Sequence, residues 1–189
     1  MKPTLLHAFA ALSLLLCASS ALGQKHRDPL TQPEMDQIRD ASWEPQQRLA
    51  LYVQFVRARL AKLEEVRSDP KVTDRPHQTH DLLDAFQRLY DELNDNIDTY
   101  VDRKDDIRKP LKLIIAADTE FQAKLRALKD EAGVKPAEYR EYEFVLTNAI
   151  DTVDTSADDH HKILQDQEDA AKHKKLNNGA NEKTGGRPE

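Results

Sequence analysis

Cysteine, glycine and aromatic residues are all scarce in this chain. Its 189 residues include 1 Cys and 5 Gly, and aromatic residues make up 6% of them. A single cysteine excludes a disulfide-stabilised scaffold, and so few glycines exclude collagen-like chains and disfavour most all-β folds. The mean hydropathy of -0.76 excludes a protein that spans a membrane several times. The composition therefore predicts one small domain that folds in water.

The one long apolar run lies at the start of the chain. Residues 1–23 contain Lys2, then a largely apolar stretch from Leu5 to Cys17, then small residues that end at Gly23. This order is typical of a secretory signal peptide, and the run is shorter than the roughly 20 apolar residues of a membrane-spanning helix. We therefore predict that residues 1–23 are removed on export, to the periplasm or to the outside of the cell.

Export would also remove the only cysteine, because Cys17 lies within the apolar run. The mature chain would then contain no thiol for nucleophilic catalysis, for a disulfide or for a thiolate metal site. A lipoprotein that keeps Cys17 for acylation is the alternative, although Leu16 stands where such sequences usually have a small residue. Without a disulfide, the stability of the mature protein has to come from packing.

Residues that break helices are sparse after the apolar run. Gly133 is the only glycine between Gln24 and Asn178, so long helical windows remain. A short first helix is predicted by Thr31 and Glu34, which have the spacing of a capping box. We expect this helix to end near residue 42.

Apolar residues recur in alternating steps of four and three across three longer windows. The windows are 45–68, about 79–132 and 136 onward, the last two being separated by Gly133. This spacing predicts helices rather than strands, and short polar loops between the windows predict antiparallel neighbours. We therefore expect an all-α fold: an elongated antiparallel helical bundle of three long helices with a short N-terminal helix before them.

Pro110 lies inside the second window and leaves two arrangements open. The apolar spacing keeps the same phase on both sides of Pro110, which favours one long middle helix that is kinked there. If continuous, that helix would be about 80 Å long at 1.5 Å per residue. A turn near Pro110 would instead give a compact four-helix bundle.

Short loops between antiparallel helices would bring Trp43, Lys104 and Gln167 to the same level of the bundle. One hypothesis is that these side chains form a buried polar layer near Tyr100, which would fix the register of the helices. The other, which we favour, is that Lys104 extends along its stem to the solvent, as long cationic side chains usually do.

The charge of the chain changes sign near its end. Residues 24–171 carry a net charge of -10, whereas residues 172–189 carry +3. An acidic body argues against nucleic-acid binding, because contacts with phosphates require clustered cations. The segment 172–189 contains three glycines and almost no apolar residues, which predicts a disordered basic tail after a helical bundle domain of residues 24–171.

Histidines near aspartates supply the only candidate metal ligands. His77 and His80 lie three residues apart at a helix start, and Asp158 and His161 have the same spacing on one helical face. Helical bundles bind metals through such pairs, so these four residues are candidates for a Zn, Ni or Cu site. Di-metal bundles also place glutamates in the core, and no glutamate lies on the apolar stripes of this chain. We therefore expect surface histidines and no cofactor.

Sequence motifs of catalysis are lacking in residues 24–189. These residues contain no glycine-rich phosphate loop and no nucleophile elbow. The acidic run 94–98 lacks the glycine of a calcium-binding loop, and Ile97 lies on the apolar stripe. We therefore expect a non-enzymatic protein that acts through contacts with another protein and does not insert stably into a membrane. The sequence leaves that partner and the oligomeric state open.

The start of the first helix resembles part of a known group of proteins. The sequence from Leu30 to Glu34, LTQPE, is followed by Gln37-Ile38-Arg39. It is similar to the LTxxQ helix starts of small periplasmic helical stress proteins. Glu34 stands where that motif has Gln, and the chain contains no second copy. The resemblance implies an alternative function, that of a metal-responsive or chaperone-like stress protein of the periplasm.

Overall fold

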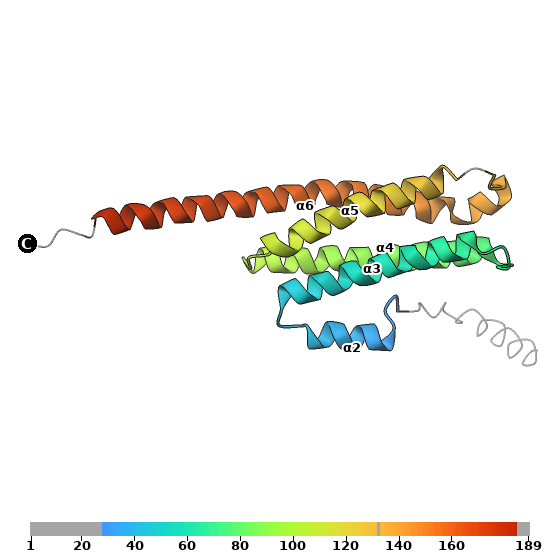
Figure 1. Cartoon of the computed structure of the whole chain (residues 1–189), viewed down its shortest axis with the longest axis horizontal. Helices are drawn as coiled ribbons and strands as arrows, with labels where there is room; N and C mark the ends of the chain where they lie inside the picture. The colour runs from blue at the N-terminus through green and yellow to red at the C-terminus, as the bar shows by residue number, and fades with distance from the viewer. Residues whose placement is uncertain (1–27, 132, 185–189) are drawn as a thin grey trace, which may run out of the picture.

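The computed structural model describes residues 28–131 and 133–184, with side chains as far as residue 174. The predicted signal peptide, residues 1–23, lies outside these ranges. Within them the regular structure is entirely helical, and the all-α prediction is confirmed (Figure 1). The helices are α2 (Gln32–Asp40), α3 (Pro45–Ser68), α4 (Arg75–Asp102), α5 (Arg108–Lys129) and α6 (Pro136–Thr184).

Helices α3 to α6 form a four-helix bundle, and the short α2 packs against α3 (Figure 1). The hairpin α3–α4 and the hairpin α5–α6 are each antiparallel and lie side by side. This places α3 alongside α5 and α4 alongside α6, each pair being parallel. Helices α4 and α5 are consecutive in the sequence but occupy opposite corners of the bundle. Their side chains meet only across the core.

The centre of the core is an aromatic cluster contributed by α4 and α5. The rings of Phe86 and Phe121 are 5.6 Å apart and perpendicular, and Tyr90 lies 5.9 Å from Phe86 and 6.1 Å from Phe121. All three side chains are fully buried. Burial of a large apolar side chain contributes about 1.5–3 kcal/mol, so this cluster is a main source of stability in a chain without disulfides.

The expectation of one continuous middle helix kinked at Pro110 is wrong. Helix α4 ends at Asp102 and α5 begins at Arg108, so the bundle is the compact four-helix alternative. Lys104 adopts a left-handed conformation with φ 61, which reverses the chain. Pro110 lies in the first turn of α5, where proline breaks no helical hydrogen bond. The apolar phase persists because Ile107 and Leu111 both enter the same core as α4.

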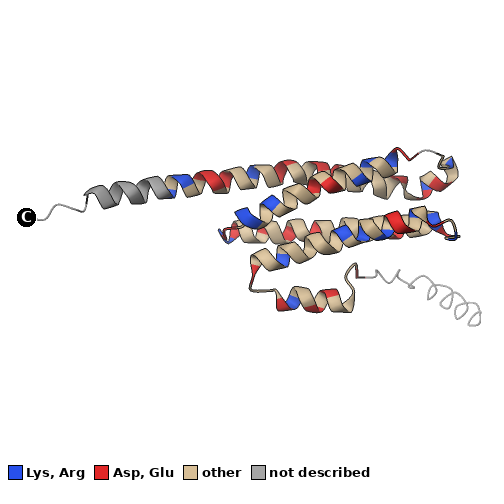
Figure 2. Ribbon diagram, in the orientation of Figure 1, with Lys and Arg blue, Asp and Glu red and all other residues tan. Residues whose placement is uncertain are grey.

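Helix α6 has 49 residues and extends well beyond the rest of the bundle (Figure 1). At 1.5 Å per residue it is about 75 Å long. The basic tail predicted from residue 172 therefore begins inside a helix that ends at Thr184, and residues 185–189 lie outside the described ranges. Both signs of charge occur on each of the described helices, without one dominant basic patch in the view of Figure 2.

Helix α2 begins as its sequence predicts. The backbone N–H of Thr31 donates a hydrogen bond of 2.7 Å to Oε2 of Glu34, as in a capping box. The Glu34 carboxylate also accepts from both terminal nitrogens of Arg59 on α3, at 2.9 and 2.6 Å. Burial raises the pKa of Glu34, but the hydrogen bonds from Arg59 and Thr31 lower it by more. Glu34 therefore links the cap of α2 to α3.

The buried polar layer of Trp43, Lys104 and Gln167, one of the two hypotheses from the sequence, does not form. The side chain of Trp43 is 91% exposed, and Lys104 is exposed, as the favoured hypothesis expected. Gln167 does reach the predicted level of the bundle. Its amide accepts from the backbone N–H of Ile107 and donates to the carbonyl of Asp105, both at 3.1 Å. This residue thus satisfies backbone groups at the α4–α5 connection.

Across residues 28–131 and 133–184, none of the helices combines the length and the apolar character needed to cross a bilayer.

Candidate functional site

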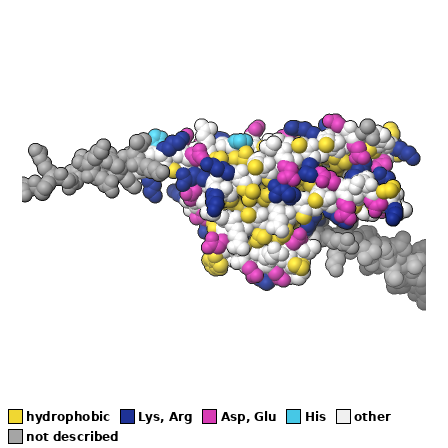
Figure 3. All heavy atoms as spheres, viewed as in Figure 1, with side chains coloured by type: hydrophobic (Ala, Val, Ile, Leu, Met, Phe, Trp, Pro, Cys, Tyr) yellow, Lys and Arg dark blue, Asp and Glu magenta, His cyan; other side chains and the backbone are white. Residues whose placement is uncertain are grey.

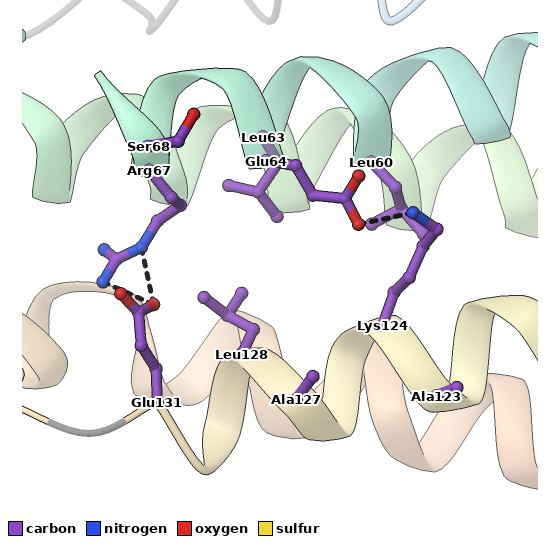
Figure 4. Close-up of a pocket in the computed structure, with 10 residues that line it drawn as sticks. All are labelled: Leu60, Leu63, Glu64, Arg67, Ser68, Ala123, Lys124, Ala127, Leu128 and Glu131. Carbon is purple, nitrogen blue, oxygen red and sulfur yellow. Dashed lines mark hydrogen bonds and ion pairs between the residues drawn. The ribbon is translucent and has the colours of Figure 1, made fainter.

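A groove with apolar walls lies between α3 and α5 near one end of the bundle (Figure 4). We call it the α3–α5 groove, and its volume is about 490 Å³. Figure 3 shows apolar side chains between charged ones on the face where α3 and α5 run. The residues that line the groove are Leu60, Leu63, Glu64, Arg67, Ser68, Ala123, Lys124, Ala127, Leu128 and Glu131.

The groove exists because α5 presents small side chains to α3 at this level. Ala123 and Ala127 are four residues apart and therefore lie on one face of α5, opposite Leu60 and Leu63 of α3. Their methyl groups do not fill the space between the two helix backbones. Larger side chains on the same two helices, among them Val56 of α3 and Phe121 of α5, are fully buried in the core.

Two ion pairs cross the groove and frame its apolar floor (Figure 4). Lys124 pairs with Glu64 at one end, and Arg67 pairs with Glu131 at 2.8 Å at the other. Glu64 and Lys124 are 56% and 30% exposed, so water screens their attraction and the pair contributes little stability. This end of the groove can therefore open at small cost.

The other end is held firmly by Arg67, which is only 8% exposed. Its guanidinium also pairs with Glu138 of α6 at 3.0 Å and lies 5.4 Å from the ring centre of Tyr142. Burial raises the pKa of Tyr142, while the charge of Arg67 acts in the opposite direction. The groove thus has one fixed end and one end that is easily rearranged.

A second polar feature lies in the core of the bundle. Asp118 of α5 accepts a hydrogen bond of 2.8 Å from the Tyr90 hydroxyl through Oδ1, and its Oδ2 lies 2.8 Å from Nδ1 of His160. The three residues come from α4, α5 and α6, and none is more than 2% exposed. Burial raises the pKa of Tyr90, and Asp118 raises it further, so the hydroxyl keeps its proton and donates it.

The metal candidates named from the sequence lie on the surface. His77 and His80 are 63% and 46% exposed, and their Nδ1 atoms lie 3.7 and 3.5 Å from the same Asp81 carboxylate oxygen. Asp158 and His161 are exposed on α6. Among the described residues, no three histidine, cysteine or acidic side chains converge as a metal site would require.

Sequence reasoning passed over the buried histidine in favour of its exposed neighbour. His160, one position before His161, joins Asp118 in the core. The signal that could have revealed this pair is the apolar spacing itself, since both residues occupy positions that the spacing assigns to the core. Two ionisable residues at core positions of different helices are expected to pair, because an unpaired buried charge is costly.

Comparisons with known proteins add no relative: no protein-family model, curated protein or solved structure matches this chain. The function is therefore argued from the geometry of the chain itself.

Proposed function

We propose that this protein is exported and acts, without catalysing a reaction, by binding another protein in the α3–α5 groove. The observation that supports this proposal is the open apolar floor of the groove, made by Ala123, Ala127 and the leucines opposite them. Apolar surface that a folded domain leaves open is a common mark of protein contact sites. Because the end at Arg67 is fixed, it would define how far a bound partner extends along the groove.

The chemistry of the groove fits an amphipathic helix of the partner. From Leu60 to Ser68 the groove follows α3 for about 12 Å, the length of roughly two helical turns. A partner helix of that length presents two apolar side chains, four residues apart, to the alanine-lined floor. The exposed charges of Glu64 and Lys124 can exchange their mutual pairing for pairs with opposite charges on the partner, because the exposed pair is weak.

The test is to fill the groove without disturbing the fold. Ala127→Leu places a larger side chain on the groove floor, whereas Ala116→Leu makes the same change on the exposed face of α5. Tagged wild type and both variants are used to capture proteins from the exported fraction of the source cells, and a captured protein is then purified and titrated directly. We expect one-to-one binding to wild type and Ala116→Leu and at least a ten-fold weaker affinity for Ala127→Leu.

Equal binding to both variants, or a complex that forms only between copies of this chain, would contradict the proposal. Self-association is measured by light scattering on the purified protein before the capture. Export is checked separately, by locating the chain in cell fractions with and without residues 1–23. A chain that stays in the cytoplasm would remove the exported part of the proposal and leave the groove part intact.

The same groove favours a second candidate, a chaperone-like protein. An open apolar floor with a rearrangeable rim also accepts apolar segments of unfolded chains, which share no particular sequence. The two candidates differ in selectivity. A chaperone-like protein would suppress the aggregation of several unrelated unfolded proteins, and Ala127→Leu would weaken that effect, whereas a specific binder would leave the aggregation unchanged.

A further inference from the structure

A small polar pocket lies on a different side of the bundle, between α4 and α6. Its volume is about 80 Å³, which admits a group of a few heavy atoms. We call it the His160 pocket, and the proposal made for it goes beyond the protein contact proposed for the groove. The pocket is lined by Asn94, Ile97, Asp98, Ser156, Asp159, His160 and Ile163.

The buried contacts of His160 determine what its ring offers to the pocket. The Asp118 carboxylate accepts from the Tyr90 hydroxyl and faces Nδ1 of His160 at 2.8 Å, so Nδ1 carries the proton and donates it. In the neutral ring Nε2 then carries no proton and offers its lone pair as an acceptor. It has no hydrogen-bond partner among the described residues. The ring therefore supplies an oriented acceptor at the wall of the pocket.

Asn94 supplies a second acceptor. Its Nδ2 donates a hydrogen bond of 2.9 Å to Oγ of Ser156, which fixes the orientation of the amide. Its Oδ1 is buried and has no partner among the described residues. A buried carbonyl oxygen without a donor is unfavourable, so a donor that fills the pocket would satisfy it and stabilise the complex.

The charge around the pocket is negative. Asp98 and Asp159 are exposed at its edge, and neither forms an ion pair within the described part of the chain. No lysine or arginine is among the lining residues. Asp118, beneath His160, adds a buried carboxylate. An anion is therefore repelled, and an apolar group would leave the acceptors unsatisfied.

We propose that the His160 pocket binds a primary ammonium group. The three N–H donors of such a group match the Asn94 oxygen, the His160 lone pair and a carboxylate at the pocket edge, and its positive charge is attracted by both Asp98 and Asp159. A metal ion fits less well, because no three metal-binding side chains converge among the described residues. The ammonium group belongs either to a free amine or to a lysine side chain of another protein.

The experiment follows the ring nitrogens of His160 by NMR in ¹⁵N-labelled protein at neutral pH, with His160→Gln used only to assign the signals. Methylammonium chloride is titrated against tetramethylammonium chloride, which has the same charge and no N–H donors. We expect a saturable shift of the His160 Nε2 signal with methylammonium alone. Putrescine then represents a free amine, and an N-acetyl-lysine amide represents a lysine side chain of another protein. Whichever of the two binds more tightly identifies the source of the ammonium group.

Two exposed aspartates that are neighbours in the sequence provide matched variants. Asp159→Asn removes a carboxylate at the pocket, and we expect it to weaken methylammonium binding about ten-fold. Asp158→Asn makes the same change one residue away, outside the pocket lining, and should leave the affinity unchanged. Circular dichroism confirms that both variants are folded.

Several outcomes would overturn the proposal. One is the absence of a saturable shift, and another is an equal shift with tetramethylammonium. A third is a ring of His160 that is doubly protonated at neutral pH before any amine is added, because the imidazolium itself would then supply the positive charge. Saturation by Zn²⁺ alone, with no response to methylammonium, would identify a metal site instead.

Discussion

Asp118 and His160 are joined by a buried hydrogen bond between α5 and α6, with Oδ2 of the aspartate 2.8 Å from Nδ1 of the histidine. Their side chains are 1% and 3% exposed. The Tyr90 hydroxyl donates to the other carboxylate oxygen at 2.8 Å. Side chains of two helices, α4 and α6, therefore hydrogen-bond to the same aspartate. Shifting either helix along the bundle axis would leave at least one of these groups unpaired in the core. The contact therefore favours one register of the bundle.

Asp118→Leu should destabilise the protein strongly. The substitution leaves the Tyr90 hydroxyl and the His160 nitrogen buried without an acceptor, and breaking a buried pair of this kind costs about 3–5 kcal/mol. Urea unfolding followed by circular dichroism measures the loss. The matched control is the triple variant Tyr90→Phe, Asp118→Leu and His160→Phe, which removes every polar member together. We expect it to be clearly more stable than Asp118→Leu alone, and a single variant that costs less than about 1 kcal/mol would contradict the argument.

The pair formed by Glu34 and Arg59 should make stability depend on pH. The pKa of Glu34 is lowered below 4.5 in the folded protein, because the hydrogen bonds from Arg59 and Thr31 outweigh the effect of burial. A lowered pKa means that the unfolded chain binds the proton more readily. The contribution is therefore fully present above pH 4.5 and is lost as the pH falls through the folded value.

Glu34→Gln isolates this contribution. Near neutral pH the variant should be less stable than wild type by about 1–2 kcal/mol, since hydrogen bonds to a charged group are lost. At about pH 3 the two proteins should unfold at more similar urea concentrations. Asp36→Asn is the control, because Asp36 pairs with Arg39 on the surface with side chains 44% and 72% exposed. A constant difference between wild type and Glu34→Gln at all pH values would show that the charge is not responsible.

The sequence was most informative where local patterns agree with tertiary packing. The capping pair Thr31 and Glu34 predicted the start of α2, and the apolar spacing predicted the helices of the bundle. The same spacing could not locate the break at residues 103–107. The short connection places Ile107 in the same core as α4, so the apolar spacing keeps its phase across the break. A continuous helix and a turn therefore produce the same sequence pattern. Pro110 marked the right region but stands after the break, inside α5.

The amino-acid sequence did not predict the contacts between helices that are far apart along the chain. The α3–α5 groove depends on which faces of two parallel, non-consecutive helices meet, and the antiparallel order expected for neighbours does not specify this. Trp43 shows the same limit, because the turn after α2 directs it to the solvent instead of toward the α4–α5 connection. His160 lay at a core position, yet spacing alone did not show that Asp118 would face it.

Zinc should leave the melting temperature of the purified, tag-free protein unchanged. His77 and His80 share a single exposed carboxylate, and such a set leaves zinc without the third or fourth protein ligand that stable sites have. A ligand that binds only the folded state raises the melting temperature by mass action, so calorimetry with Zn²⁺ or Cu²⁺ is a direct measurement. A rise that disappears in His77→Ala or His161→Ala would favour the metal-responsive alternative over the protein-binding proposal.

Lys104→Gly should preserve or raise stability by up to about 1 kcal/mol. Lys104 has φ 61, a left-handed conformation that costs a residue with a Cβ about 1–2 kcal/mol and glycine almost nothing. Part of this gain is offset because glycine loses more backbone entropy on folding. Thermal unfolding compares the variant with Ala116→Gly, an exposed position in the interior of α5 where glycine should cost about 1 kcal/mol. A loss of stability as large as that of Ala116→Gly would contradict this expectation, because the exposed lysine side chain would then have to contribute a stabilising contact.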